Sequence, residues 1–293
     1  MANYDDLFMP SNADNAFDKE VWVAQKQQER EAIYHRIAAY VQAMNGDGKR
    51  FQTYLDVQAK FDRYSVSNAI LIADQMPQAT YLADFESWKQ NGVYVRKGAV
   101  GISILEPGKE YEKTDGSTGV SYNVKKVFDI SQTNSRQKFT PSISRDERLL
   151  LKALMNTFPG SFQISNGLPD HTNAMYSVKE DTIFVRQGLS AFDIFRSIAG
   201  EMVHANLHKG GYKCQSPDFV AYSAAYLLCK RNGVSVQDFS FERIPSQYHS
   251  IEEKEIRSEM STIREIAGEI STSMNRFFEV QERRNKHRDV GVR

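Results

Sequence analysis

The sequence predicts an α+β fold in two parts, and three observations lead to this prediction. Apolar residues recur at helical spacing from Val21 to Met44, and shorter helical patterns follow as far as residue 90. The period then changes to two between residues 94 and 130, as in half-buried strands. Helical spacing returns from residue 146 onward. We therefore expect N-terminal helices with a small antiparallel sheet, then a mostly helical part with a short β-hairpin and a long C-terminal helix.

The first part is expected to contain four helices before its strands. Asn45-Gly46-Asp47-Gly48 ends the first helix, Pro77 limits the third, and Asn91-Gly92 ends the fourth. The polar, glycine-bearing stretch from Pro107 to Gly119 predicts an exposed hairpin loop. The expected helices cover 21–44, 51–61, about 65–76 and 85–90, and the expected strands cover 94–98, 101–105 and 121–130.

The second part follows a linker, for which the polar stretch from Ser131 to Ser144 is the best candidate. The expected elements are helices over 146–157, 192–208, 219–232 and 251–285, with paired strands over 175–178 and 182–186. The last helix carries an apolar stripe made of Ile256, Met260, Ile263, Ile266, Ile270 and Met274. The predicted divisions are an acidic segment 1–20, a first domain 21–135, a second domain 145–250, and a helix with a basic tail 251–293.

Composition and charge favour a globular cytoplasmic protein. The chain has 293 residues with no net charge, no apolar run of 18 residues and no apolar signal-peptide core, so we expect no membrane partner. The two cysteines form no metal-ligand pattern and fit reduced thiols. Residues 21–140 hold 16 basic and 13 acidic residues, a mild positive bias that a mixed solvated surface explains as well as a nucleic-acid partner does.

Aromatic and basic residues alternate in the segment 81–97. Tyr81, Phe85, Trp88 and Tyr94 are interleaved with Lys89 and with Arg96-Lys97. Aromatic faces can stack exposed bases while cations follow the phosphates, which suits single-stranded nucleic acid. The alternative is an ordinary core, in which Phe85 and Trp88 hold a helix to the sheet.

The same region resembles the N-terminal domain of ArdC antirestriction proteins. The resemblance rests on Tyr64-Ser65, Asn68, Leu71-Ile72, Gln75, Pro77, Ala79-Thr80, Phe85, Trp88, Gly92-Val93, Val95, Lys97-Gly98, Gly101-Ile102, Ile104-Leu105 and Pro107. Residues 122–133 are similar to the end of that domain in LtrC-like proteins of conjugative elements. The resemblance implies sequence-independent binding of single-stranded DNA. We expect the contacts to come from Arg63, Tyr64, Asn68, Trp88, Arg96, Lys97, Lys125 and Lys126.

Residues 196–208, RSIAGEMVHANLH, resemble the active-site helix of zincin metallopeptidases, the broad class of the ArdC second domain. That class places His-Glu-x-x-His on the helix, where two histidines bind zinc and the glutamate acts as general base. Here Gly200 stands in place of the first histidine, which leaves Glu201 and His204. The class takes its third ligand from an acid on the following helix, but 219–226 contains none, and Tyr222 is expected there.

A shifted metal site is the alternative. His204 and His208 are four residues apart and share a helix face with Glu201, and Cys214 follows nearby, so zinc could bind in this register. No general base would then lie between the histidines. We favour a degenerate domain in which Glu201 and His204 are vestigial, no residue is catalytic, and no cofactor is needed.

Three functions are consistent with the sequence. The favoured one is a single-stranded DNA-binding protein of a mobile genetic element that supports antirestriction, conjugative transfer or replication. The second is an active or shifted-register zinc metallopeptidase that DNA binding localises. The third is a protein-interaction scaffold that binds a partner through the second domain or the long C-terminal helix.

Overall fold

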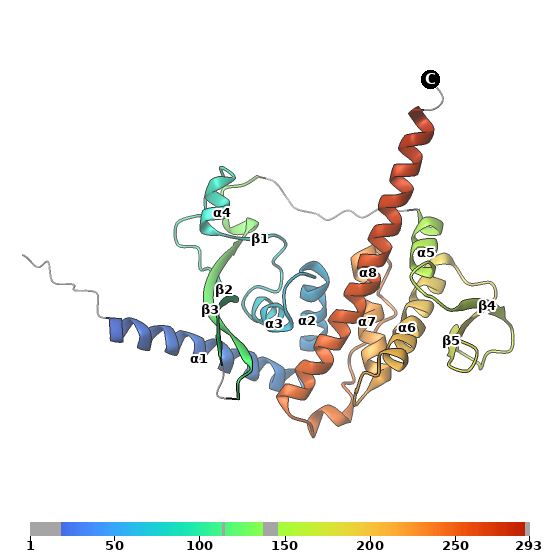
Figure 1. Cartoon of the computed structure of the whole chain (residues 1–293), viewed down its shortest axis with the longest axis horizontal. Coiled ribbons are helices and arrows are strands. Elements are labelled where there is room, and N and C mark those ends of the chain that lie inside the picture. The colour runs from blue at the N-terminus through green and yellow to red at the C-terminus, as the bar shows by residue number, and fades with distance from the viewer. Residues whose placement is uncertain (1–18, 113–114, 137–145, 291–293) are drawn as a thin grey trace, which may run out of the picture.

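The fold was analysed in a computed structural model that describes residues 19–112, 115–136 and 146–290. Most of the acidic segment 1–20, the second half of the predicted linker and the last three residues therefore lie outside the described residues. The first part lies on one side of the molecule and the second part on the other, and α8 runs along their junction (Figure 1). The predicted α+β class is confirmed, with a small antiparallel sheet in the first part and a long C-terminal helix.

The four helices predicted for the first part are all present. Asp47, Ser65 and Asp84 cap α2, α3 and α4, because each side chain accepts a backbone N–H from the first turn. The elements of the first part are α1 (Lys19–Met44), α2 (Gly48–Lys60), α3 (Val66–Gln75), β1 (Leu82–Asp84), α4 (Phe85–Gln90), β2 (Ile102–Glu112), β3 (Thr118–Asp129) and the 3-10 turn η2 (Ile130–Gln132).

The strands of the first part differ from the prediction in two places. The predicted loop 107–119 is wrong, because β2 continues to Glu112 and β3 begins at Thr118. A register shift between Pro107 and Glu110 lets the edge strand β2 pass its proline and continue pairing. The predicted strand 94–98 is also wrong. This segment bonds instead to η2 and the residues after it, through an isolated bridge between Val95 and Thr133.

Helix α3 covers the outer edge of β2, in the sheet order β1-β3-β2. The Asn68 amide donates to the Leu105 carbonyl at 2.8 Å and accepts the Leu105 N–H at 2.7 Å. Gln75, two turns further along α3, makes the same pair of bonds to Ser103, at 2.9 Å each. These two side chains take the place of a neighbouring strand, so they protect an edge that would otherwise invite pairing with another chain.

The second part is helical around a small mixed sheet. Its elements are α5 (Glu147–Met155), β4 (Ser161–Ser165), β5 (Ala174–Ser177), β6 (Thr182–Arg186), α6 (Ala191–Gly210), α7 (Pro217–Asn232), the 3-10 turn η3 (Ser246–His249) and α8 (Glu253–Val290). The predicted hairpin is β5–β6, and β4 pairs in parallel on the other side of β6. The sequence did not predict β4, since this short strand is mostly exposed and lacks a clear apolar alternation.

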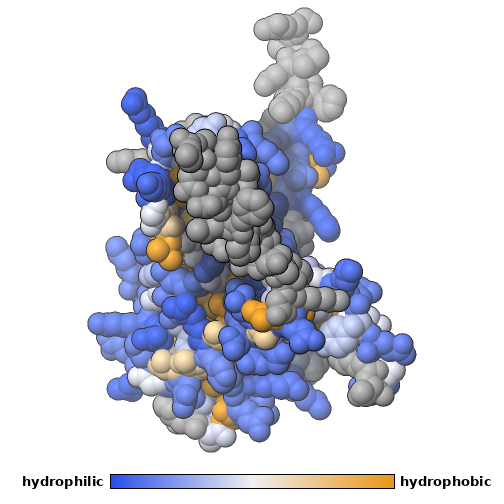
Figure 2. Space-filling view, turned by 90° about the vertical axis from the view of Figure 1, so that its left-hand side faces the viewer, coloured by the Kyte–Doolittle hydropathy of each residue, from blue (hydrophilic) through white to orange (hydrophobic). Residues whose placement is uncertain are grey.

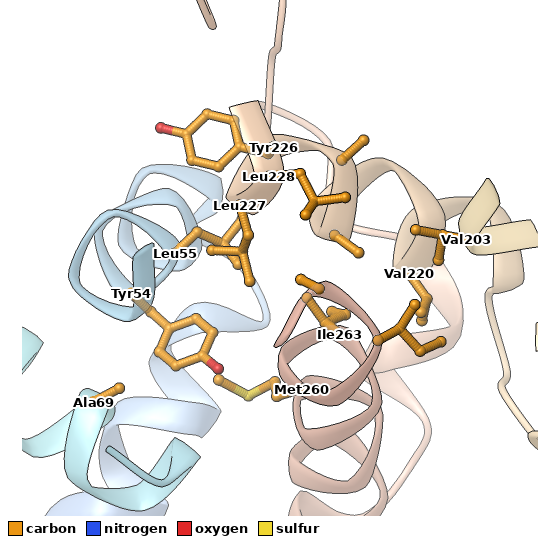
Figure 3. Close-up of a cluster of buried hydrophobic side chains, with 14 of the residues drawn as sticks. Tyr54, Leu55, Ala69, Val203, Val220, Tyr226, Leu227, Leu228, Met260 and Ile263 are labelled. Carbon is orange, nitrogen blue, oxygen red and sulfur yellow. The ribbon is translucent and has the colours of Figure 1, made fainter. Parts of the chain in front are cut away.

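One hydrophobic core runs through both parts of the chain. Figure 3 shows where they meet: Tyr54 and Leu55 of α2 lie against Leu227 of α7 and Met260 of α8. Beside this contact, the Tyr226 hydroxyl donates to the Asp56 carboxylate at 2.7 Å. All six side chains of the predicted α8 stripe are buried here or nearby. The stripe is therefore part of the chain's own core.

Candidate functional sites

One face of the first sheet carries an exposed lysine and a pair of aromatic rings, and the turn 96–101 reaches this face at Gly101. Lys126 on β3 donates to the Ser103 hydroxyl at 2.6 Å, and its side chain is exposed. Phe128, two residues further on the same face, makes an edge contact with Phe85 at the start of α4, with ring centroids 6.5 Å apart. Gly101 approaches this face so closely that an added Cβ would lie 3.0–3.1 Å from Phe128 and Lys126 atoms.

The turn itself carries Arg96 and Lys97, whose side chains are exposed. Its backbone is fixed by η2: the Arg96 N–H donates to the Gln132 carbonyl, and the Gln132 amide donates to the Val100 carbonyl. Gly98 has φ +84°, in the left-handed region that favours glycine. The open face of the first sheet is hereafter the surface formed by Phe85, Arg96, Lys97, Lys126 and Phe128.

The opposite face of β3 carries Lys125 in a different setting. Its ammonium lies 2.8 Å from the Glu106 carboxylate and 3.0 Å from that of Asp84. The hydrogen bonds that Lys125 donates to Glu106 and Asp84 raise its pKa. Tyr64 is half-buried near this pair, and burial raises the pKa of its hydroxyl while Lys125 lowers it. Lys125 and Tyr64 thus lie together, away from Lys126.

Two of the predicted DNA contacts point into the fold. Asn68 is buried, and its amide is hydrogen-bonded to the Leu105 backbone, as described above. Trp88 is 4% exposed, and its indole N–H donates to the Phe128 carbonyl at 2.9 Å. Both side chains therefore have a structural role that accounts for their place in the matched pattern.

Arg63 lies apart from the open face, in a groove between the α2–α3 loop and α8. The groove has a volume of about 620 Å³ and also contains Arg264, whose Nε donates to the Tyr64 carbonyl at 2.8 Å. Three arginines and three acids line it, so its charges balance. The charged lining residues are Asp62, Arg63, Arg264, Glu265, Glu269 and Arg276.

The surface on the side of the first part is mainly hydrophilic, with small and separate apolar patches (Figure 2). Such a surface suits a charged or polar partner better than a large apolar one. Within the described ranges, no helix is long and apolar enough to cross a membrane.

The peptidase-like site lies on α6, beside the free edge of β5. The Glu201 carboxylate accepts the Tyr176 N–H at 2.7 Å, a backbone donor that β6 does not use. Burial raises the pKa of Glu201, and Asp218 adds to this effect, whereas the Tyr176 N–H and His204 lower it. Glu201 therefore ties the helix to the strand edge.

Asp218 is the residue that the sequence analysis missed. Its Oδ1 lies 3.6 Å from His204 Nε2, at the first turn of α7. The helix was predicted to begin at Phe219, but α7 begins at Pro217 and so includes Asp218. The start signal was present: Pro217 and an acid at 218 are typical of a first helical turn. Tyr222 points elsewhere, since its hydroxyl accepts the Ser240 N–H.

The residues do not form a complete metal site. Among the described residues, no group of three His, Cys, Asp or Glu side chains is placed to hold a metal ion. Gly200 supplies no ligand, and His208 is exposed. Cys214 belongs to another cluster, where burial and then Glu259 raise the pKa of its thiol to about 11. Among the described residues, the side chains of the shifted-register site are therefore not brought together.

Comparison with known proteins defines the class of this fold. Residues 26–140 match the family described as the N-terminal domain of anti-restriction factor ArdC. The antirestriction ArdC protein from R388 plasmid has a similar fold in a metal-free crystal structure, with a TM-score of 0.54 and 17% identity over 73% of this chain and 86% of that one.

Its Mn(II)-bound crystal structure gives a TM-score of 0.52 and 16% identity over 72% and 85% of the two chains. No curated protein matches the chain. The chain is thus similar to ArdC proteins in the sequence of residues 26–140 and in its fold over about three quarters of its length.

Proposed function

We propose that the chain binds single-stranded DNA without sequence specificity, through the open face of the first sheet. The observation that carries the proposal is the exposed Lys126 on the same strand face as the Phe85–Phe128 pair, next to a turn that reaches this face at Gly101 and carries the exposed Arg96 and Lys97. Stacking of a base on an aromatic ring stabilises such complexes by about 1–3 kcal/mol, and neighbouring cations neutralise the phosphates.

The other five residues that were predicted to contact DNA lie in surroundings that leave them a smaller part in the interface. Asn68 and Trp88 are engaged within the fold, and Lys125 is paired with two carboxylates. Tyr64 lies on the Lys125 side, and Arg63 lies in a groove of balanced charge. We therefore assign the main contacts to Arg96 and Lys97, with Lys126 beside them.

The second part of the chain is proposed to lack peptidase activity. Gly200 removes one ligand from the helix on which zincins bind their metal, so the water that Glu201 would activate has no ion to hold it. The scaffold alternative loses its main support, because the α8 stripe is buried inside the chain. In a mobile genetic element, the proposed DNA binding would support antirestriction, conjugative transfer or replication.

The test is a binding comparison with the full chain. Fluorescence anisotropy with labelled oligonucleotides should show salt-sensitive binding that is tighter for single strands than for duplexes. Arg96→Glu combined with Lys97→Glu should weaken this binding by at least ~10-fold and reduce its dependence on salt. The full chain is needed because α2 packs against α7 and α8, so a fragment ending near Thr133 would expose core residues.

A matched control separates local contacts from net charge. Lys179→Glu combined with Lys213→Glu makes the same charge change at exposed positions of the second part. This variant should keep most of the affinity. Absence of binding at low salt, or equal losses in the two double variants, would overturn the proposal.

A further inference from the structure

The peptidase-like site retains more of a metal centre than its sequence indicates. We infer that a single residue, Gly200, keeps this site empty, and that His204 and Asp218 remain placed as two ligands of a three-ligand site for a divalent transition-metal ion. The natural chain then binds no such ion at stoichiometry. A histidine at position 200 completes the site. This inference is independent of DNA binding.

The separation of the two remaining ligands fits a metal centre. In a tetrahedral zinc site, bonds of about 2.0–2.1 Å place neighbouring ligand atoms about 3.4 Å apart. His204 Nε2 and Asp218 Oδ1 lie 3.6 Å apart. The Asp218 side chain is 99% exposed and approaches His204 from the first turn of α7. The pair is thus at coordination distance without a metal to hold it there.

The position of the missing ligand is open. Gly200 lies four residues before His204 on α6, so side chains at the two positions share one face of the helix. An added Cβ at Gly200 would meet no atom within 4 Å outside its immediate helix surroundings. The glycine also has no positive φ that would strain a larger residue. The backbone at position 200 therefore accepts a side chain, whose Cβ meets open space.

Glu201 does not take the place of the missing ligand. Its Oε2 is bound to the Tyr176 N–H, on the strand side of the helix. With two imidazoles and one carboxylate, the completed site suits Zn²⁺, which accepts nitrogen and oxygen ligands and leaves a fourth position open. The difference between this chain and a metal-binding one is thus confined to one side chain.

The experiment measures zinc on the full-length protein. Gly200→His is incubated with excess Zn²⁺ and dialysed, and the metal is quantified by mass spectrometry. We expect close to one zinc per chain, against far less in the natural protein. Zinc should also raise the thermal unfolding temperature of the variant alone. The change in zinc affinity should exceed the ~10–100-fold that substitutions outside the ligand set produce.

Three further variants make the result decisive. Gly200→Ala makes the same helix-favouring change without a ligand and should bind no zinc. Gly200→His with Asp218→Asn should lose the zinc that Gly200→His gains. Gly200→Cys offers a smaller ligand and should bind zinc even if the imidazole disturbs the fold. Stoichiometric zinc in the natural protein, zinc binding that survives Asp218→Asn, or no binding by both the His and Cys variants would overturn the inference.

Discussion

Lys125 and Lys126 are neighbours in the sequence but lie on opposite faces of the first sheet, in opposite surroundings. Lys125 lies between Glu106 and Asp84, which neutralise it. Among the described residues, Lys126 donates to two neutral oxygens, those of Ser103 and Gly101, and forms no ion pair, so that its charge stays uncompensated. Because side chains alternate across a strand, a single DNA strand lying on one face cannot use both lysines equally.

Two consecutive lysines in a sequence therefore do not form one basic patch on the surface when they lie in a strand. On one face, the Lys125 ammonium pairs with Asp84 and Glu106 and so links β3 to the start of α4 and to β2. On the other face, the Lys126 ammonium contacts the neutral Ser103 hydroxyl, and its charge is available to a partner. The same division applies to α4, where Trp88 is buried and Phe85 is 50% exposed. We therefore expect residues such as Trp88 to affect the stability of the fold, and residues such as Phe85 and Lys126 to affect single-strand binding.

The largest expected effect is on stability. Trp88→Ala removes a buried indole and leaves the Phe128 carbonyl without its donor, so the free energy of unfolding should fall by ~3–5 kcal/mol. Chemical denaturation of the full chain measures this. Phe85→Ala is the matched control three residues away. It should leave stability within ~1 kcal/mol but weaken single-strand binding by ~1–3 kcal/mol, the cost of losing one stacked base. A large loss of stability in Phe85→Ala, with stability kept and binding weakened in Trp88→Ala, would contradict this assignment of the two residues.

A smaller effect is expected from the two lysines themselves. Lys126→Gln should weaken single-strand binding a few-fold and lower the slope of log affinity against log salt by ~0.7, the value for one phosphate contact on a single strand. Lys125→Gln should leave that slope unchanged, since its charge is already compensated by Glu106 and Asp84. Anisotropy titrations at several salt concentrations measure both. Equal slopes for the two variants would show that the faces do not differ in binding.

Much of the fold could be predicted from the sequence, because its signals are local. Helix caps such as Asp47 and Ser65 and the stripe on α8 depend on residues within one or two turns. The errors arose where distant residues decide. Residues 94–98 alternate like a strand but bond to the segment after η2, and β4 is defined by its parallel partner β6.

The sites were predicted less well for the same reason. Residue type pointed to Asn68 as a possible DNA contact, but its place against the edge of β2 depends on how α3 meets the sheet. Asp218 was missed because its helix was expected to begin at the next residue, Phe219, and its approach to His204 joins two helices, which the sequence does not show. In contrast, the glycine at position 200 was visible from the sequence alone, since it concerns one position in a fixed helical spacing.

The smallest effect tests how strongly the Lys125 face is held together. The backbone N–H of Ser87 and then Lys125 hold the pKa of Asp84 at about 2, below its ordinary value of 3.8. Since the folded pKa is lowered, the charged form stabilises the fold above about pH 4, and this contribution is lost as the pH falls toward 2. Asp84→Asn keeps a capping side chain, so it removes mainly the charge.

We therefore expect Asp84→Asn to lower the free energy of unfolding at pH 7 by ~0.3–1 kcal/mol, the usual contribution of an acid at a helix N-terminus. The difference from the natural protein should shrink between pH 4 and pH 2, where Asp84 itself becomes protonated. Urea denaturation over this pH range measures it. A difference that stays constant down to pH 2 would mean that the Asp84 charge does not hold this face together, and Lys125 would then be freer for DNA than its two carboxylate contacts indicate.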